Sequence, residues 1–203
     1  MKRIVALIIL LMLISCSEQT PYADGVKYIY KVKYSNSEFE DIITVEKTVV
    51  SGFVSKLLLE TEVRQDKGSS TGYSVESTVP NSTSEIKLPH PIGEYLDLTN
   101  LLPPPTIKFP IIVGDSLYSE HTVEFKHSPY NGTLVKGYIK VLGRELINNP
   151  LVHDSCWVLK VYKLDSKDTT ATFYYNDEYG FTELNYSFGV DNILIYLDSL
   201  ETN

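Results

Sequence analysis

From residue 26 onward, polar and apolar residues alternate with a period of two, and this alternation limits the possible folds more than any other feature. It is clearest in Val26–Tyr34, where one side carries Val26, Tyr28, Tyr30, Val32 and Tyr34 and lysines dominate the other. Successive side chains of a β-strand point to opposite faces of a sheet. The segment is therefore predicted to be a half-buried strand.

Similar short segments recur along the chain, separated by turn-forming residues such as Pro129-Tyr130-Asn131-Gly132. The sequence shows no long amphipathic helix. These features predict a mostly β fold, with a curved antiparallel meander sheet or half-barrel of about 9–10 strands. Gly137 and Gly143 are expected to mark bends or bulges. The further strands are expected at Asp41–Val50, Phe53–Gln65, Tyr73–Val79, Leu117–Lys126, Thr133–Leu146, Cys156–Leu164, Thr169–Tyr175, Phe181–Phe188 and Ile193–Leu200.

Residues 80–110 interrupt this pattern because they hold seven of the ten prolines. Proline cannot donate a hydrogen bond to a sheet, so the segment is not a central strand. At most one short helix is expected in it, around Glu94–Leu101. The leucines and isoleucines beside the prolines predict that residues 89–110 form a strap across one side or one mouth of the sheet, with any ligand entering beside them. The prolines are Pro80, Pro89, Pro91, Pro103, Pro104, Pro105 and Pro110.

The first residues have the order of an export signal. Lys2 and Arg3 precede an apolar run of eleven residues, Ile4–Ile14. That length suits a signal-peptide core of ~7–15 residues and falls short of the ~20 needed to span a bilayer. The run ends in Leu13-Ile14-Ser15-Cys16, which resembles a bacterial lipobox.

The lipobox resemblance implies cleavage between Ser15 and Cys16, a diacylglycerol on the Cys16 thiol and a further acyl chain on the new amine. Two or more acyl chains anchor a protein stably. An ordinary secretory signal with an incidental cysteine is the alternative. The expected organisation is a signal peptide at 1–15, an acylated cysteine and polar tether at 16–25, and a single β-rich domain at 26–203.

Ser17 follows the cysteine and resembles the sorting signal for the outer membrane, where the domain would face the periplasm or the cell surface. Cleavage would remove Lys2 and Arg3 and change the formal net charge from −8 to −10. This acidic balance argues against a nucleic-acid partner and against docking on anionic lipid. Cys156, the other cysteine, lies in an apolar run and is expected to be buried, the alternative being an intermolecular disulfide.

A second resemblance covers about the last sixty residues. Gly143-Arg144-Glu145, Cys156-Trp157-Val158, Tyr174-Tyr175 and Glu178-Tyr179-Gly180-Phe181 resemble a pattern in secreted bacterial half-barrel domains of the lipoprotein-carrier superfold. The resemblance implies a curved antiparallel sheet closed by short helices or loops over an apolar concave face. This chain departs from the carriers in having no clear helices between its strands, which weakens the case for transport.

Motifs for chemistry are sparse. His153-Asp154-Ser155 has the residue types of a hydrolase triad, but adjacent residues on an extended chain point in different directions. The four histidines form no metal-binding motif, so neither a metal nor another cofactor is expected. A pair of catalytic carboxylates for glycoside hydrolysis, drawn from distant positions in the sequence, stays an open alternative. The 15 tyrosines indicate strand packing or an aromatic face for lipid, glycan or protein.

The leading hypothesis is a non-enzymatic envelope lipoprotein, attached to the membrane by its lipid anchor. It would bind an apolar ligand or act as an accessory subunit of an envelope assembly. The alternatives are an envelope hydrolase and a structural or surface-display protein.

Overall fold

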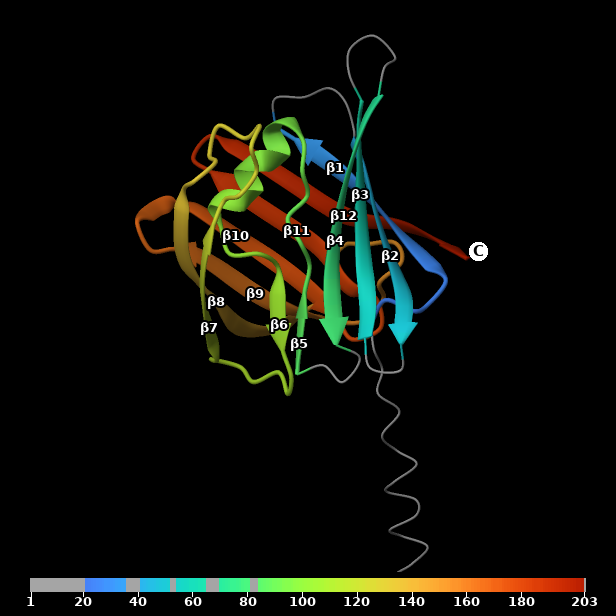
Figure 1. Ribbon diagram of the computed structural model, residues 1–203. Helices are drawn as coiled ribbons and strands as arrows, with labels where there is room; N and C mark the ends of the chain where they lie inside the picture. Colours follow the sequence, from blue (N-terminus) through green and yellow to red (C-terminus); the bar gives the residue numbers. More distant parts are fainter. Residues whose placement is uncertain (1–20, 36–40, 52–53, 65–69, 81–83, 203) are drawn as a thin grey trace, which may run out of the picture.

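A computed structural model describes residues 21–202, apart from 36–40, 52–53, 65–69 and 81–83. Ten antiparallel strands form one sheet in the order β4-β3-β2-β1-β12-β11-β10-β9-β8-β7 (Figure 1). The predicted meander is confirmed, and only the β1–β12 pair joins strands far apart in sequence. The strands are β1 (Val26–Tyr34), β2 (Asp41–Ser51), β3 (Val54–Arg64), β4 (Ser70–Pro80), β7 (Ser116–Thr122), β8 (Leu134–Glu145), β9 (Cys156–Lys163), β10 (Ser166–Asn176), β11 (Gly180–Phe188) and β12 (Asp191–Thr202).

The sheet curves, so that β2–β4 and β7–β8 stand on opposite sides of a concave face (Figure 1). Register shifts interrupt the ladders, including one between Ile29 and Tyr30 and one between Val141 and Gly143. Such bulges bend a strand and increase its twist. Gly143 has a φ of 152°, which agrees with its predicted place at a bulge.

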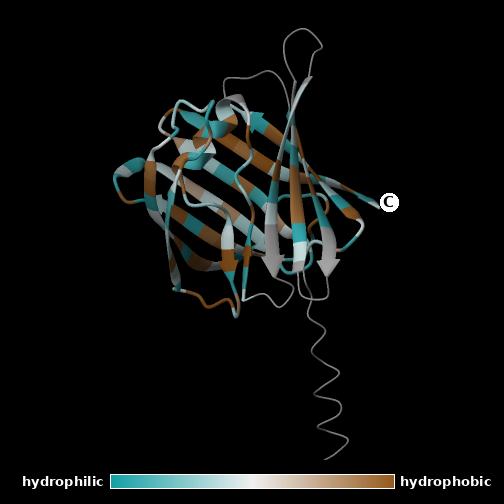
Figure 2. Ribbon diagram, in the orientation of Figure 1, coloured by the Kyte–Doolittle hydropathy of each residue, from teal (hydrophilic) through white to brown (hydrophobic). Residues whose placement is uncertain are grey.

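The concave face carries the hydrophobic core (Figure 2). Cross-strand neighbours on this face are apolar: Tyr30 lies opposite Ile43 on β2 and Leu197 on β12. Further along the sheet, Phe173 lies opposite both Leu159 and Leu184. The alternating residues of the same strands form the outer face, which is more polar. This is the arrangement that the period-two pattern predicted.

The segment between β4 and β7 crosses the concave face. It contains β5 (Glu85–Lys87), a 3₁₀ helix η1 (Glu94–Leu101) and β6 (Thr106–Lys108), with β5 and β6 paired as a separate two-stranded ladder. We call residues 84–109 the strap. Its apolar side chains join the main core, and their exposed fractions are 0–4%: Ile86, Leu88, Leu96, Leu102 and Ile107. The predicted strap and short helix are therefore confirmed.

Close contacts seat the strap on the sheet. Gly137 of β8 has no side chain, and a Cβ there would lie 2.7 Å from Cγ of Pro103 and would also meet the Tyr162 carbonyl oxygen. Over β1 and β2 of the same face, Tyr95 of η1 stacks on Tyr34 with ring centroids 4.3 Å apart and donates a hydrogen bond to Asp41. Among the described residues, no helix is long and apolar enough to cross a membrane.

Candidate functional site

The predicted lipidation and cleavage residues, Ser15 and Cys16, lie outside the described residues, and the first described part of the chain is packed. Tyr22 is 1% exposed and has a φ of 63°. Its ring covers Gly180, where a Cβ would lie 2.6 Å from Cζ of the tyrosine. The packed domain thus starts before residue 26, inside the segment expected to be a free polar tether.

Hydrogen bonds to β11 hold Tyr22 in place. The Phe181 amide donates to the Tyr22 hydroxyl at 3.0 Å, and the Tyr30 hydroxyl donates to the Phe181 carbonyl at 2.7 Å. The Tyr22 and Tyr28 rings meet edge to face, 5.0 Å apart. Burial raises the pKa of Tyr22 and of Tyr30, so both hydroxyls stay neutral at ordinary pH. Tyr22 therefore fixes the end of the chain that leads from the predicted anchor to the sheet. We call this docked side chain the Tyr22 plug.

Two hollows border the sheet in the part of the chain that the structure describes. Between β6 of the strap and strands β7–β9 lies a hollow of about 90 Å³, lined in part by Ile107, Leu117 and Ile139. A larger hollow of about 400 Å³ lies over β1–β4 on the outer face and is lined by Lys27, Glu60 and other mostly polar residues. Ligand pockets typically measure ~300–1,000 Å³ and are mostly apolar. Neither hollow combines that size with an apolar lining.

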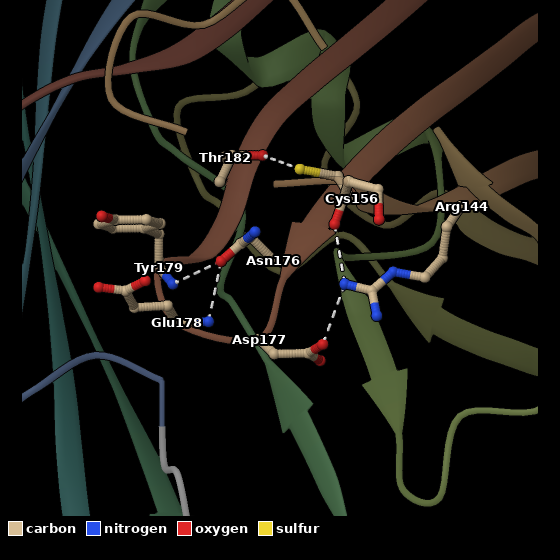
Figure 3. A network of polar contacts seen from close by, with 8 residues as sticks. Arg144, Cys156, Asn176, Asp177, Glu178, Tyr179 and Thr182 are labelled. Carbon is tan, nitrogen blue, oxygen red and sulfur yellow. Dashed lines mark hydrogen bonds and ion pairs between the residues drawn. The ribbon is translucent and has the colours of Figure 1, made fainter. Parts of the chain in front are cut away.

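Cys156 lies on the outer side of β9, in the polar network of Figure 3. It is completely buried, as predicted, and its Sγ lies 3.5 Å from the Thr182 hydroxyl. Burial raises the pKa of the thiol, whereas a nucleophilic cysteine needs a lowered pKa. The loop between β8 and β9 reaches β12, where Asn149 Nδ2 donates to the Leu197 carbonyl at 2.9 Å. The burial and the raised pKa both fit a packing residue rather than a nucleophile.

The rest of this network organises a turn. Arg144 forms an ion pair with Asp177 at 3.1 Å and lies over the Trp157 ring, 4.9 Å from its centroid. Asn176 Oδ1 accepts the backbone amides of Glu178 and Tyr179 at 2.9 and 3.3 Å, which fixes the β10–β11 hairpin (Figure 3). These contacts give the group a structural role.

The triad-like residues do not form a site, since His153 and Asp154 are exposed on the β8–β9 loop. Among the described residues, no group of three or more His, Cys, Asp or Glu could hold a metal ion.

The structure brings together two histidines that have no shared motif. His90 of the strap and His121 of β7 have ring centroids 5.6 Å apart. The His121 Nε2 lies 3.0 Å from the Asn100 carbonyl, whereas both ring nitrogens of His90 are buried with no hydrogen-bond partner. Burial, then the neighbouring His121 and Lys87, lowers the pKa of His90 to about 3. His90 is therefore neutral at ordinary pH, and the pair closes the strap against the sheet edge.

The outer face carries a row of tyrosines across β7, β8 and β9. Tyr138 lies opposite Tyr118 on one side and Tyr162 on the other. The Tyr138 and Tyr162 rings are stacked, 4.9 Å apart, and Tyr118 is 56% exposed. The Tyr118 hydroxyl donates to Glu120, which also pairs with Lys136 at 3.3 Å. Strand alternation places these three rings on one face, but their cross-strand register could not be read from the sequence.

No family model matches the chain, and no curated protein matches it. Among solved structures, a candidate lipoprotein from Parabacteroides distasonis has a TM-score of 0.51 at 11% identity, over 92% of this chain and 100% of the other. A candidate exported protein with a YmcC-like fold, from Bacteroides fragilis, has a TM-score of 0.49 at 10% identity, with the same two coverages. The first likeness shows a shared fold, which is mostly β and built on a large antiparallel sheet.

Proposed function

We propose that this chain is a non-enzymatic envelope lipoprotein whose domain acts as an accessory subunit, held at the membrane by acylated Cys16. The observation that carries the accessory role is the strap. Its own apolar side chains occupy the concave face that a carrier with a half-barrel fold would leave open for an apolar ligand. The lipobox residues and the fold shared with a candidate lipoprotein support the envelope location.

Displacing the strap would be costly. Full burial of an aliphatic side chain contributes ~1.5–3 kcal/mol, so the five buried strap side chains contribute about 8–15 kcal/mol. The whole stability of a domain is ~5–15 kcal/mol. A ligand that displaced the strap would have to replace nearly all of this burial. Function is therefore expected on the outer surface, and the tyrosine row of Tyr118, Tyr138 and Tyr162 is its best candidate.

Photo-crosslinking in the envelope tests the accessory role. A benzophenone amino acid in place of Tyr138 should give a discrete crosslinked product, and the same group in place of Lys167, on β10, should not. Lys167 is exposed and lies outside the tyrosine row. Crosslinks of equal yield from both positions, or from neither, would contradict a partner on the tyrosine row.

A carrier of an apolar ligand is the second candidate, and the hollow of about 90 Å³ beside β6 favours it. Titration of the purified domain with a fluorescent fatty acid separates the two functions. We expect no saturable binding, because the hollow is too small for an acyl chain without movement of the strap. Saturable binding that fatty acid competes away would instead support the carrier.

The anchor itself is tested by replacing Cys16 with Ala. This variant should lose labelling by a fatty-acid probe and should not be processed normally. The outer membrane, facing the periplasm or the cell surface, is the proposed location because Ser17 follows the cysteine. Fractionation of Ser17→Asp should then move the protein toward the inner membrane.

A further inference from the structure

The loop between β6 and β7 presents two apolar side chains to solvent. Ile112 is 53% exposed and Val113 is 58% exposed. In Figure 2 this loop is the brown segment at the lower end of the domain. Exposed apolar groups of this kind often mark an interaction site when they lie together.

Backbone hydrogen bonds hold the loop in shape. The Gly114 amide donates to the Val141 carbonyl at 2.9 Å, and the Val141 amide donates to the Asp115 carbonyl at 3.0 Å. The Asp115 amide closes a turn on the Ile112 carbonyl at 3.2 Å. Gly114 has a φ of 94°, which favours glycine. The fold therefore positions Ile112 and Val113 at the tip of a turn whose shape is fixed by backbone hydrogen bonds.

Aromatic contacts connect this loop with the Tyr22 plug. Tyr22 is bonded to Phe181, whose ring lies 5.4 Å from that of Tyr175. The Tyr175 ring lies 5.9 Å from that of Phe109, and the loop begins at the next residue. Leu146, which is 76% exposed, follows β8 at this same end of the sheet. The apolar loop and the point where the chain enters the domain thus share one end of the fold.

The number of residues before the plug limits how far this end can be from the membrane. Cys16 and Pro21 are five residues apart, and an extended chain of that length spans at most ~18 Å. With acyl chains of Cys16 in the bilayer, Pro21, where the chain enters the domain, stays within this distance of the anchor. The opposite end is farther away, because β11 alone extends ~26 Å from Gly180 to Phe188.

We propose that Ile112 and Val113 insert into the membrane interface as a second contact, next to the lipid anchor, and orient the domain on the bilayer. This inference rests on the proposed acylation of Cys16. Asp177 and Glu178 lie in the β10–β11 hairpin at the same end. Their charge disfavours anionic lipid, so the partner surface is a bilayer of low net charge, entered by apolar contact rather than by electrostatic attraction.

Depth-dependent quenching tests the contact on the acylated full-length protein in vesicles of phosphatidylethanolamine and phosphatidylcholine. The environment-sensitive NBD fluorophore is attached to Ile112→Cys, and in a control to Val190→Cys. Val190 is 89% exposed on the β11–β12 turn, at the opposite end. Cys156 is buried and should not compete for the label. We expect a blue shift, a several-fold brightening and quenching by nitroxide-labelled lipid at position 112, and none of these at 190.

Equal signals at the two positions would overturn the inference. So would a blue shift at 112 that appears without vesicles or resists nitroxide lipid, since it would indicate a second copy or a protein partner. Flotation of the same samples separates the two levels of the argument. Protein that fails to float with vesicles has no working anchor, which overturns the proposed function and the inference with it. Protein that floats with an unquenched label at 112 keeps its anchor and loses only the loop contact.

Discussion

Tyr22 offers a direct test of whether the predicted tether is free or docked. Replacing it with Phe removes the hydroxyl that accepts the Phe181 amide at 3.0 Å, and leaves that buried N–H without a partner. An unsatisfied buried donor costs about 1–3 kcal/mol. Replacing it with Ala also removes a ring that is 1% exposed, for which a loss of about 3–5 kcal/mol is typical.

These free energies can be measured as melting temperatures. For a domain of this size, 1 kcal/mol corresponds to about 2–4 °C, so Tyr22→Phe should lower Tm by about 2–12 °C and Tyr22→Ala by about 6–20 °C. Tyr118→Phe is the matched control, because that tyrosine is 56% exposed and the change should stay within about 0.5 kcal/mol. If Tyr22→Ala melts with the parent protein, residues 21–25 are a free tether, and the fixed entry point of the chain is lost.

Three further changes probe the strap, the histidine pair and the thiol. Gly137→Ala should force both Pro103 and the Tyr162 carbonyl away from β8 and raise the fluorescence of a bound apolar dye, whereas Gly72→Ala, with open space around it, should not. Because the folded-state pKa of His90 is lowered to about 3, its contribution to stability is present above the unfolded value of about 6.5 and is lost as pH falls toward 3. Denaturant midpoints of His90→Gln should therefore fall less steeply over that range than those of the parent. Cys156 should react slowly with a thiol reagent in the native state and quickly after denaturation, and fast native labelling would show that it is exposed.

The strands were predictable because each carries its own evidence. In β1 and β9, the residues that face the core are every second residue of one short segment, so the pattern can be read locally. The predicted starts at Val26 and Cys156 agree with the structure. The strands β5 and β6 were missed because each has only three residues and lies among prolines. Their pairing depends on the sheet beneath them, through Ile86 and Ile107, and leaves no periodic signal.

The plug and the histidine pair could not be predicted in the same way. Tyr22 stands in a polar stretch, and its partner Phe181 is 159 positions away in sequence. His90 and His121 meet only because the strap crosses to the edge strand β7. In both cases the partner is brought near by tertiary structure, and neither local composition nor spacing carries information about it. In the sequence Gly180 stood out only as part of Glu178-Tyr179-Gly180-Phe181, and nothing there indicated that an aromatic ring packs against it.

Two glycines of the sheet thus allow segments outside it to pack closely against its backbone. Gly137 lets Pro103 reach the floor of the concave face, and Gly180 lets Tyr22 reach the end of β11, so two segments outside the sheet are fixed by close approach to its backbone. Since the first contact helps the strap to cover the concave face, the proposed partner would bind the outer face. Since the second fixes where the chain enters, an anchored domain would present its tyrosine row at a defined height above the bilayer. Lengthening the chain between Cys16 and Pro21 with a Gly/Ser insert should therefore weaken crosslinking from Tyr138 without changing Tm, whereas an equal loss of both would mean that the insert disturbs the fold itself.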